Sequence, residues 1–109
     1  EELALRRQLR FPPFWRLVRL LVRGRNTKRV EEAASRAADL ARAVAGDRAD
    51  VLGPVECPLA MIAGNHRRHI VLRGERLGPV HAAARAVQQA WRKGAGVYLE
   101  IDVDPVSLL

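Results

Sequence analysis

The stretch FWRLVRLLVR, residues 14–23, fixes where the first strand of the fold lies. Its apolar residues alternate, so that Val18, Leu20 and Val22 fall on one side of an extended backbone. Arginine and further apolar side chains fall on the opposite side. The stretch therefore predicts a β-strand with one face toward a core and another face of mixed basic and apolar character.

A helix is predicted after a turn at residues 24–26. Thr27 is a suitable N-cap, because its hydroxyl can accept a hydrogen bond from a free N–H of the first turn. The helical pattern continues to Gly46, since glycine tolerates the positive φ that often ends a helix. The apolar stripe of this Ala-rich helix consists of Val30, Ala34, Ala37, Ala41 and Val44.

The second half of the chain contains three more strands and one more helix. A short strand at Ala49–Leu52 ends at Gly53-Pro54, and a loop is predicted from Val55 to His66 because it contains further Pro and Gly. The elements that follow are a strand at Arg67–Arg73, a helix from Gly78-Pro79 to Gly94, and a last strand at Val97–Val103.

The order β-α-β-β-α-β predicts an α+β fold, the split-βαβ or ferredoxin-like sandwich. Right-handed crossovers would place both helices on one face of a four-stranded antiparallel sheet, with the first and third strands at its centre. We expect a single domain at residues 14–109, preceded at residues 1–13 by a short connecting helix and a Pro-Pro entry.

Composition excludes several classes of protein. A chain of 109 residues with 49% hydrophobic and 28% charged residues is typical of a globular domain. No apolar run approaches the roughly 18 residues that a membrane span needs, and no signal peptide is visible. A single cysteine, Cys57, cannot form a disulfide within the chain, which favours the reducing cytoplasm.

Positive charge is concentrated in two segments. Residues 1–30 are net +7 and residues 65–93 net +6, whereas residues 31–64 and 94–109 are each net −3. If folding joins the two basic segments into one surface, that surface attracts polyanions, nucleic acid above all. The alternative is a solvated arginine-rich surface without a ligand.

The face of the sheet opposite the helices is predicted to expose Trp15, Leu17 and Leu21 among arginines. A basic sheet with aromatics can stack the bases of a single strand. So much apolar surface more commonly packs against a partner, which is the interpretation that we favour.

Catalytic motifs are scarce. No phosphate-binding glycine loop is present, and Cys57, His66, His69 and His81 lack the spacing of a metal site. Asp102 and Asp104 leave one side of an extended segment, so a metal-dependent nuclease stays open as an alternative function.

Several motifs together resemble one family. They are Phe11-Pro12-Pro13-Phe14, Leu52-Gly53-Pro54, the Gly64-x-x-Arg67-x-x-Ile70-x-Leu72 pattern and the closing Ile101-Asp102-Val103-Asp104-Pro105. In this order they are similar to the C-terminal region of bacterial primosomal protein N′, the PriA family of replication-restart DNA helicases. The resemblance covers nearly the whole chain.

The resemblance implies a fold like that of a small-subunit ribosomal protein and a non-catalytic piece of an ATP-dependent 3′-to-5′ helicase. It implies as partners single-stranded or forked DNA, single-stranded DNA-binding protein and the helicase lobes of the parent chain. ATP, magnesium and zinc would belong to the full-length protein, with no cofactor in this chain.

Site residues follow from the charge pattern read together with this resemblance. For phosphate contact we predict Arg67, Arg68, Arg25, Lys28 and Arg29. For packing against the helicase body we predict Trp15, Leu17 and Leu21. The rival interpretation is a protein-interaction module without direct DNA contact, for example one that binds the tail of single-stranded DNA-binding protein.

Overall fold

A computed structural model describes residues 16–62, 64–91 and 96–103. Its elements follow the predicted order: β1 (Arg16–Gly24), α2 (Thr27–Ala45), β2 (Asp50–Ile62), β3 (Asn65–Gly74), α3 (Leu77–Ala90) and β4 (Val97–Val103). The predicted connecting helix at residues 1–13, the Pro-Pro entry and Trp15 lie outside the described residues.

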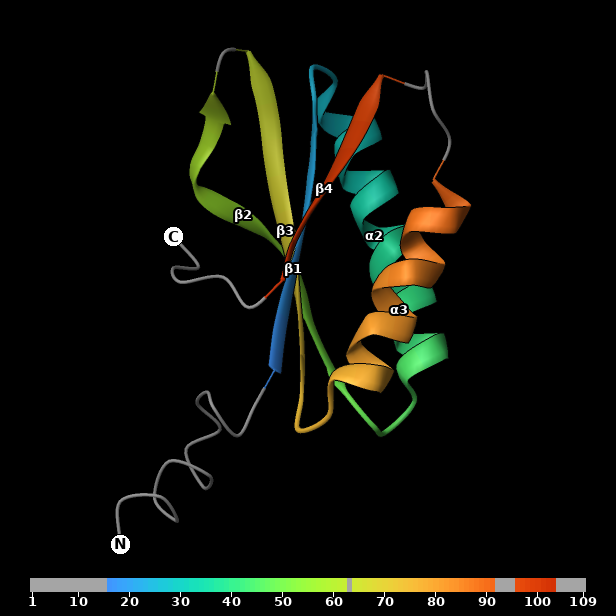
Figure 1. Ribbon diagram of the computed structural model, residues 1–109. Helices are drawn as coiled ribbons and strands as arrows, with labels where there is room; N and C mark the ends of the chain where they lie inside the picture. The colour runs from blue at the N-terminus through green and yellow to red at the C-terminus, as the bar shows by residue number, and fades with distance from the viewer. Residues whose placement is uncertain (1–15, 63, 92–95, 104–109) are drawn as a thin grey trace, which may run out of the picture.

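The four strands form one antiparallel sheet in the order β2-β3-β1-β4. Both helices cover the same face, and the opposite face carries neither of them (Figure 1). The predicted α+β, ferredoxin-like arrangement is confirmed, with β1 and β3 at the centre of the sheet. We call the side without helices the open face.

The core lies between the sheet and the helices. Val18, Leu20 and Val22 of β1 are fully buried there, as the alternation in the sequence predicts. The small side chains of α2 allow it to approach the sheet closely. Burial of such aliphatic side chains supplies most of the stabilisation of a domain of this size.

Three local predictions were wrong. The N-cap of α2 is Asn26 rather than Thr27: the Asn26 backbone is extended, and its side-chain oxygen accepts a hydrogen bond from the Arg29 N–H at 3.0 Å. Asparagine caps helices at least as well as threonine. The C-terminus at Gly46 is confirmed, with φ of 59°.

The second error concerns β2, which runs from Asp50 to Ile62 where a short strand and a loop were expected. Pro54 and Pro58 suggested the loop. However, β2 is an edge strand, where proline is tolerated because one row of backbone groups needs no ladder partner. Its pairing with β3 shifts register in two places, between Leu52 and Val55 and between Glu56 and Met61.

The second helix is shorter than predicted. It ends at Ala90 rather than at Gly94, and Trp91 is its C-cap. The Trp91 indole N–H donates to the backbone carbonyl of Val97 at 3.0 Å, which ties the end of α3 to the start of β4. None of the described helices is both long and apolar enough to span a bilayer.

Candidate nucleic-acid interface

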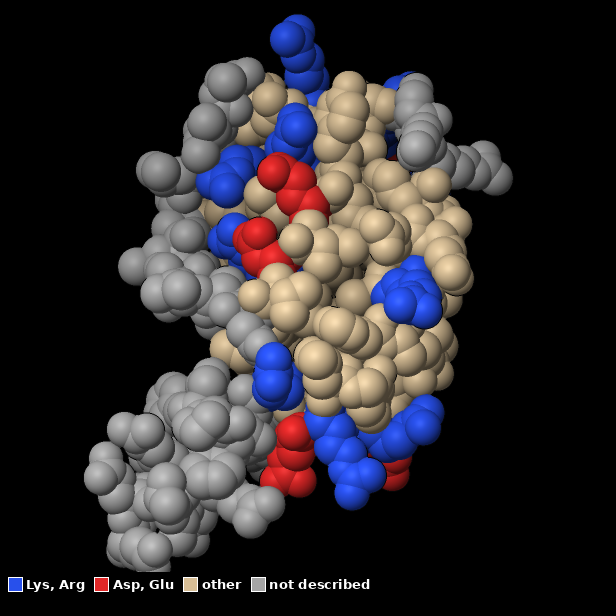
Figure 2. Space-filling model, in the orientation of Figure 1, with Lys and Arg blue, Asp and Glu red and all other residues tan. Residues whose placement is uncertain are grey.

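Three of the predicted phosphate contacts lie together where β1 ends and α2 begins. Arg25 is in the turn, and Lys28 and Arg29 are in the first turn of α2. All three side chains are exposed, and none forms an ion pair with a described carboxylate. Figure 2 shows basic side chains projecting at this upper end of the molecule. We call these three residues the basic turn.

The N-terminus of α2 adds to the positive potential of the basic turn. Free N–H groups and the helix dipole make a helix N-terminus positive, and acidic residues usually occupy the first turn for that reason. The first turn of α2 contains no acidic residue and instead carries Lys28 and Arg29. Dipole and side chains therefore act in the same direction, toward an anion.

Arg68 has a different environment from the basic turn. It pairs across the strands with Val22, so its side chain points to the helix side of the sheet. Its guanidinium lies 2.9 Å from Glu31 of α2 and 3.4 Å from Glu56 of β2, and its side chain is only 12% exposed. These ion pairs connect α2 to the sheet. Because both carboxylates already occupy the guanidinium, the geometry does not favour phosphate contact by Arg68.

Arg67 points the other way, onto the open face. The register places it opposite Arg23 of β1, and Arg23 in turn lies opposite Tyr98 of β4. These three residues therefore form one row across β3, β1 and β4. Since Arg23 is followed by Gly24 and Arg25, the row lies next to the basic turn.

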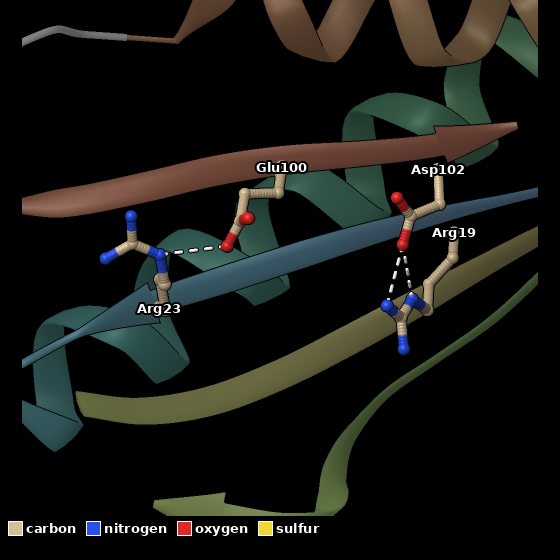
Figure 3. A network of polar contacts seen from close by, with 4 residues as sticks. All are labelled: Arg19, Arg23, Glu100 and Asp102. Carbon is tan, nitrogen blue, oxygen red and sulfur yellow. Dashed lines mark hydrogen bonds and ion pairs between the residues drawn. The ribbon is translucent and has the colours of Figure 1, made fainter. Parts of the chain in front are cut away.

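Two ion pairs join β1 to β4 on the open face (Figure 3). Arg19 donates to one oxygen of Asp102 through Nη2 at 2.7 Å and through Nε at 3.2 Å. Arg23 donates through Nε to Glu100 at 2.9 Å. A carboxylate that accepts two N–H bonds is a poor ligand for a cation, and this weakens the nuclease hypothesis based on Asp102.

Asp104, the other member of the hypothetical nuclease pair, lies outside the described residues. Within the ranges that the structure describes, no three His, Cys, Asp or Glu side chains gather as a metal site would require.

Cys57 and His69 also lie among these charges. Burial raises the pKa of the Cys57 thiol, and the nearby Arg67, Arg19 and Arg68 only partly offset that effect. Burial lowers the pKa of His69, and Arg19 and Arg67 lower it further. Both groups therefore stay neutral near pH 7, and Cys57 is a buried thiol rather than an activated nucleophile.

The predicted packing residues are less exposed than the sequence suggested. Leu21 is on the open face but is only 5% exposed within this chain, and Leu17 is half-buried. Among the side chains that the structure describes, the exposed aliphatic residues on this face are Leu52 and Val55, which pair across the strands with Val71 and His69. The sequence analysis missed them because it ended the strand at Leu52 and placed Val55 in a loop.

Tyr98 is the other residue that the sequence analysis missed. It is 53% exposed, and the Arg23 guanidinium carbon lies 4.7 Å from its ring centroid. A signal was present, since the alternation of β4 places Tyr98 on the same side as Glu100 and Asp102. Its position beside Arg23 follows only from the β1–β4 register.

A groove of about 580 Å³ lies between α2 and α3 on the side away from the sheet's open face. Its floor is apolar and includes Trp91 and Leu40, and its rim carries Arg29, Arg36 and Glu32. Arg29 thus belongs both to the basic turn and to this groove.

Fold and site together define a small α+β domain, two helices on a four-stranded sheet, with a basic end. The fold alone does not indicate a function. The de novo designed protein Foldit4 shares it with a TM-score of 0.64 at 13% identity, over 82% of this chain and 94% of that one.

The sequence identifies the family. The family model "Primosomal protein N C-terminal domain" matches residues 7–106, and the chain belongs to this family. It is 43% identical over 109 residues to "Replication restart protein PriA" of Treponema pallidum and 25% identical to the protein of that name from Borreliella burgdorferi. The chain is matched in full but spans only 17% and 16% of those two proteins.

Proposed function

We propose that this chain is a non-catalytic DNA-binding and docking domain of a replication-restart helicase, acting on single-stranded or branched DNA at stalled forks. The observation that carries the proposal is the basic turn: three exposed cations at the positive end of a helix, none of them ion-paired with a carboxylate in the described part of the chain. Such a cluster binds phosphates without reading base sequence. This role would place the protein in the cytoplasm, at the nucleoid.

Arg67 extends the proposed contact across the sheet. It shares a row with Arg23 and lies on the same side of the sheet as the residues that lead into the basic turn. A strand of DNA that crosses the end of the sheet could therefore meet Arg67 and the basic turn in succession. ATP, magnesium and zinc would act in other parts of the parent protein.

The proposal is tested by fluorescence anisotropy with labelled single-stranded DNA at several salt concentrations. Replacing Arg25, Lys28 and Arg29 by Ala should reduce the slope of log affinity against log salt by about two, since each phosphate contact on a single strand contributes about 0.7. The matched control replaces Arg48, Arg76 and Arg85, three exposed cations elsewhere, and has the same net charge.

Equal losses in the two triple variants would show that only net charge matters, and the assignment to the basic turn would fail. Salt-independent binding by the unchanged chain, or none at low salt, would overturn the DNA-binding function itself.

Docking on the parent protein is the second part of the proposal. The chain spans 17% of the Treponema pallidum protein, so the rest of a comparable parent could cover the β2 side of the open face, away from β4. Leu52 and Val55 are the exposed aliphatic residues of that face, and Leu17 would lie toward the same partner. Replacing Leu52 and Val55 by Ser should weaken co-purification with the separately expressed helicase portion; unchanged recovery would contradict docking through this face.

The groove between α2 and α3 favours a second candidate function, a protein-interaction module without direct DNA contact. Arg29 and Arg36 on its rim and the apolar floor suit a peptide that combines an apolar side chain with acidic residues. The tail of single-stranded DNA-binding protein, implied by the family resemblance, is the occupant to test. Arg36→Ala should weaken peptide binding and spare DNA, whereas Arg25→Ala should do the opposite.

A further inference from the structure

Tyr98 is the chain's single tyrosine, and it lies at the basic end of the open face. It is 53% exposed on the edge strand β4, next to Arg23 in the row that ends at Arg67. A single exposed apolar ring is common on protein surfaces, so exposure alone does not mark a site. What distinguishes Tyr98 is its position on the open face, beside Arg23 and next to the basic turn.

The Tyr98 ring is held in place from one side. Glu100 accepts a hydrogen bond from Arg23 Nε at 2.9 Å, which orients the guanidinium, and the guanidinium carbon lies 4.7 Å from the ring centroid. This cation–π contact supports one face of the ring. Among the described residues no other aromatic or cationic group stacks on Tyr98.

We propose that Tyr98 is a stacking platform for an unpaired nucleobase of a DNA strand whose phosphates contact the basic turn. The proposal rests on the DNA-binding function proposed above and adds a preference to it. Every base has an aromatic face, so stacking tolerates any sequence. A duplex keeps its base faces stacked on each other, so Tyr98 would select single strands.

The placement of the charges agrees with this role. Arg23 is neutralised by Glu100, so the support of the ring is uncharged as a pair and does not compete for phosphate. The cations that have no ion-pair partner among the described residues begin two residues later, at Arg25. A base on Tyr98 would thus leave its flanking phosphates beside the basic turn.

The test compares two oligonucleotides of about 12 nucleotides, within the usual range for folds that bind single strands: oligothymidine and an abasic strand with the same phosphates. Tyr98→Ala in the full chain should weaken binding to oligothymidine about fivefold or more, the effect of one lost base–aromatic stack. Binding to the abasic strand should not change. Tyr98→Phe should retain the affinity for oligothymidine.

Val103→Ala is the matched control, because Val103 is another apolar residue of β4 with 51% exposure. It should leave both affinities unchanged. Thermal melting of each variant shows whether the fold is retained, and the comparison of the two oligonucleotides on the unchanged chain keeps the test valid if Tyr98→Ala unfolds.

A spectroscopic readout separates stacking from a structural role. Because the chain has one tyrosine, incorporation of meta-fluorotyrosine reports on position 98 alone. Oligothymidine should shift the fluorine resonance, and the abasic strand should shift it far less. If the chain binds oligothymidine and the abasic strand equally well, and Tyr98→Ala changes neither affinity, the stacking proposal is wrong and phosphate binding alone is supported. If the unchanged chain binds neither oligonucleotide, the DNA-binding function fails as well.

Discussion

Basic side chains in two adjacent regions of this domain have opposite surroundings. Along β1, Arg19 and Arg23 are each held by a carboxylate of β4 (Figure 3). Just beyond the strand, the basic turn has no described carboxylate partner. The formal charge of +7 thus overstates what the sheet offers to a polyanion and understates how strongly the remaining positive charge is concentrated at one end.

The difference reflects geometry rather than residue type. In a sheet, cross-strand neighbours lie about 5 Å apart, so an arginine on β1 meets whatever β4 presents in register. A turn at the end of the sheet has no such neighbour. Arginines of the same sequence segment therefore stabilise the fold in one place and stay available for a ligand in the next.

The largest effect on stability is expected at Asp102. Asp102→Ala leaves Arg19, whose side chain is 14% exposed, without the carboxylate oxygen that accepts two of its N–H groups. Removing one partner of a half-buried ion pair leaves the other charge without compensation, so the free energy of unfolding should fall by about 2 kcal/mol. Urea denaturation measures this change.

The control for Asp102 is the neighbouring pair. Glu100→Ala should lower the free energy of unfolding by less than Asp102→Ala does, because Arg23 is more exposed than Arg19 and keeps its contact with Tyr98. Adding Arg19→Met to Asp102→Ala should restore part of the loss, since no buried charge is then left alone. A full-sized loss in the double variant would contradict the ion-pair explanation.

Arg67 and Arg68 sharpen the comparison because they are adjacent and face opposite sides. Arg68→Met should lower the free energy of unfolding by about 1 kcal/mol, as it breaks contacts with Glu31 and Glu56, and should not change DNA affinity. Arg67→Met should reduce the salt slope of DNA binding by about 0.7. Urea denaturation and fluorescence anisotropy are measured on both variants. If only Arg68→Met weakened DNA binding, then Arg68 rather than Arg67 would be the phosphate contact.

Charge reversal in the basic turn should separate stability from binding. Lys28→Glu and Arg29→Glu place carboxylates at the positive end of α2, so each should raise the free energy of unfolding by about 0.5 kcal/mol at low salt. The same changes should sharply weaken DNA binding. Arg36→Glu, in the middle of α2, is the control and should give no dipole gain. If Lys28→Glu and Arg29→Glu instead lowered the free energy of unfolding, the two cations would contribute to the stability of the fold.

The fold was predictable because its signals are periodic. Alternation in β1 and the Ala-rich stripe of α2 require only local sequence. The extent of β2 was not predictable in this way, because Pro54 and Pro58 resemble loop residues until β2 is known to be an edge strand.

The site was predictable only in part, for a related reason. The basic turn is continuous in sequence, so its three cations could be placed at one end of a helix. The partner of Arg68 is Glu31, 37 residues away, and no local pattern reveals that contact. Tyr98 likewise became a candidate only when the register placed it beside Arg23.

His69 gives the smallest expected effect and tests the charge of the open face directly. Its Nδ1 atom is buried and has no hydrogen-bond partner among the residues that the structure describes. Its pKa lies below the usual 6.5 because of burial, with Arg19 and Arg67 adding to the effect. The folded chain therefore binds this proton less readily than the unfolded chain. Stability should fall as pH drops below about 6.5, until the folded His69 also becomes protonated.

His69→Gln should flatten this dependence in urea denaturation at pH 7 and pH 5.5. His81→Gln, at an exposed position of α3, should leave it intact. The sign follows from linkage, because stability rises with pH wherever the unfolded state binds more protons. A slope that persists in His69→Gln would show that another titrating group causes the pH dependence, and the role given to His69 would be wrong.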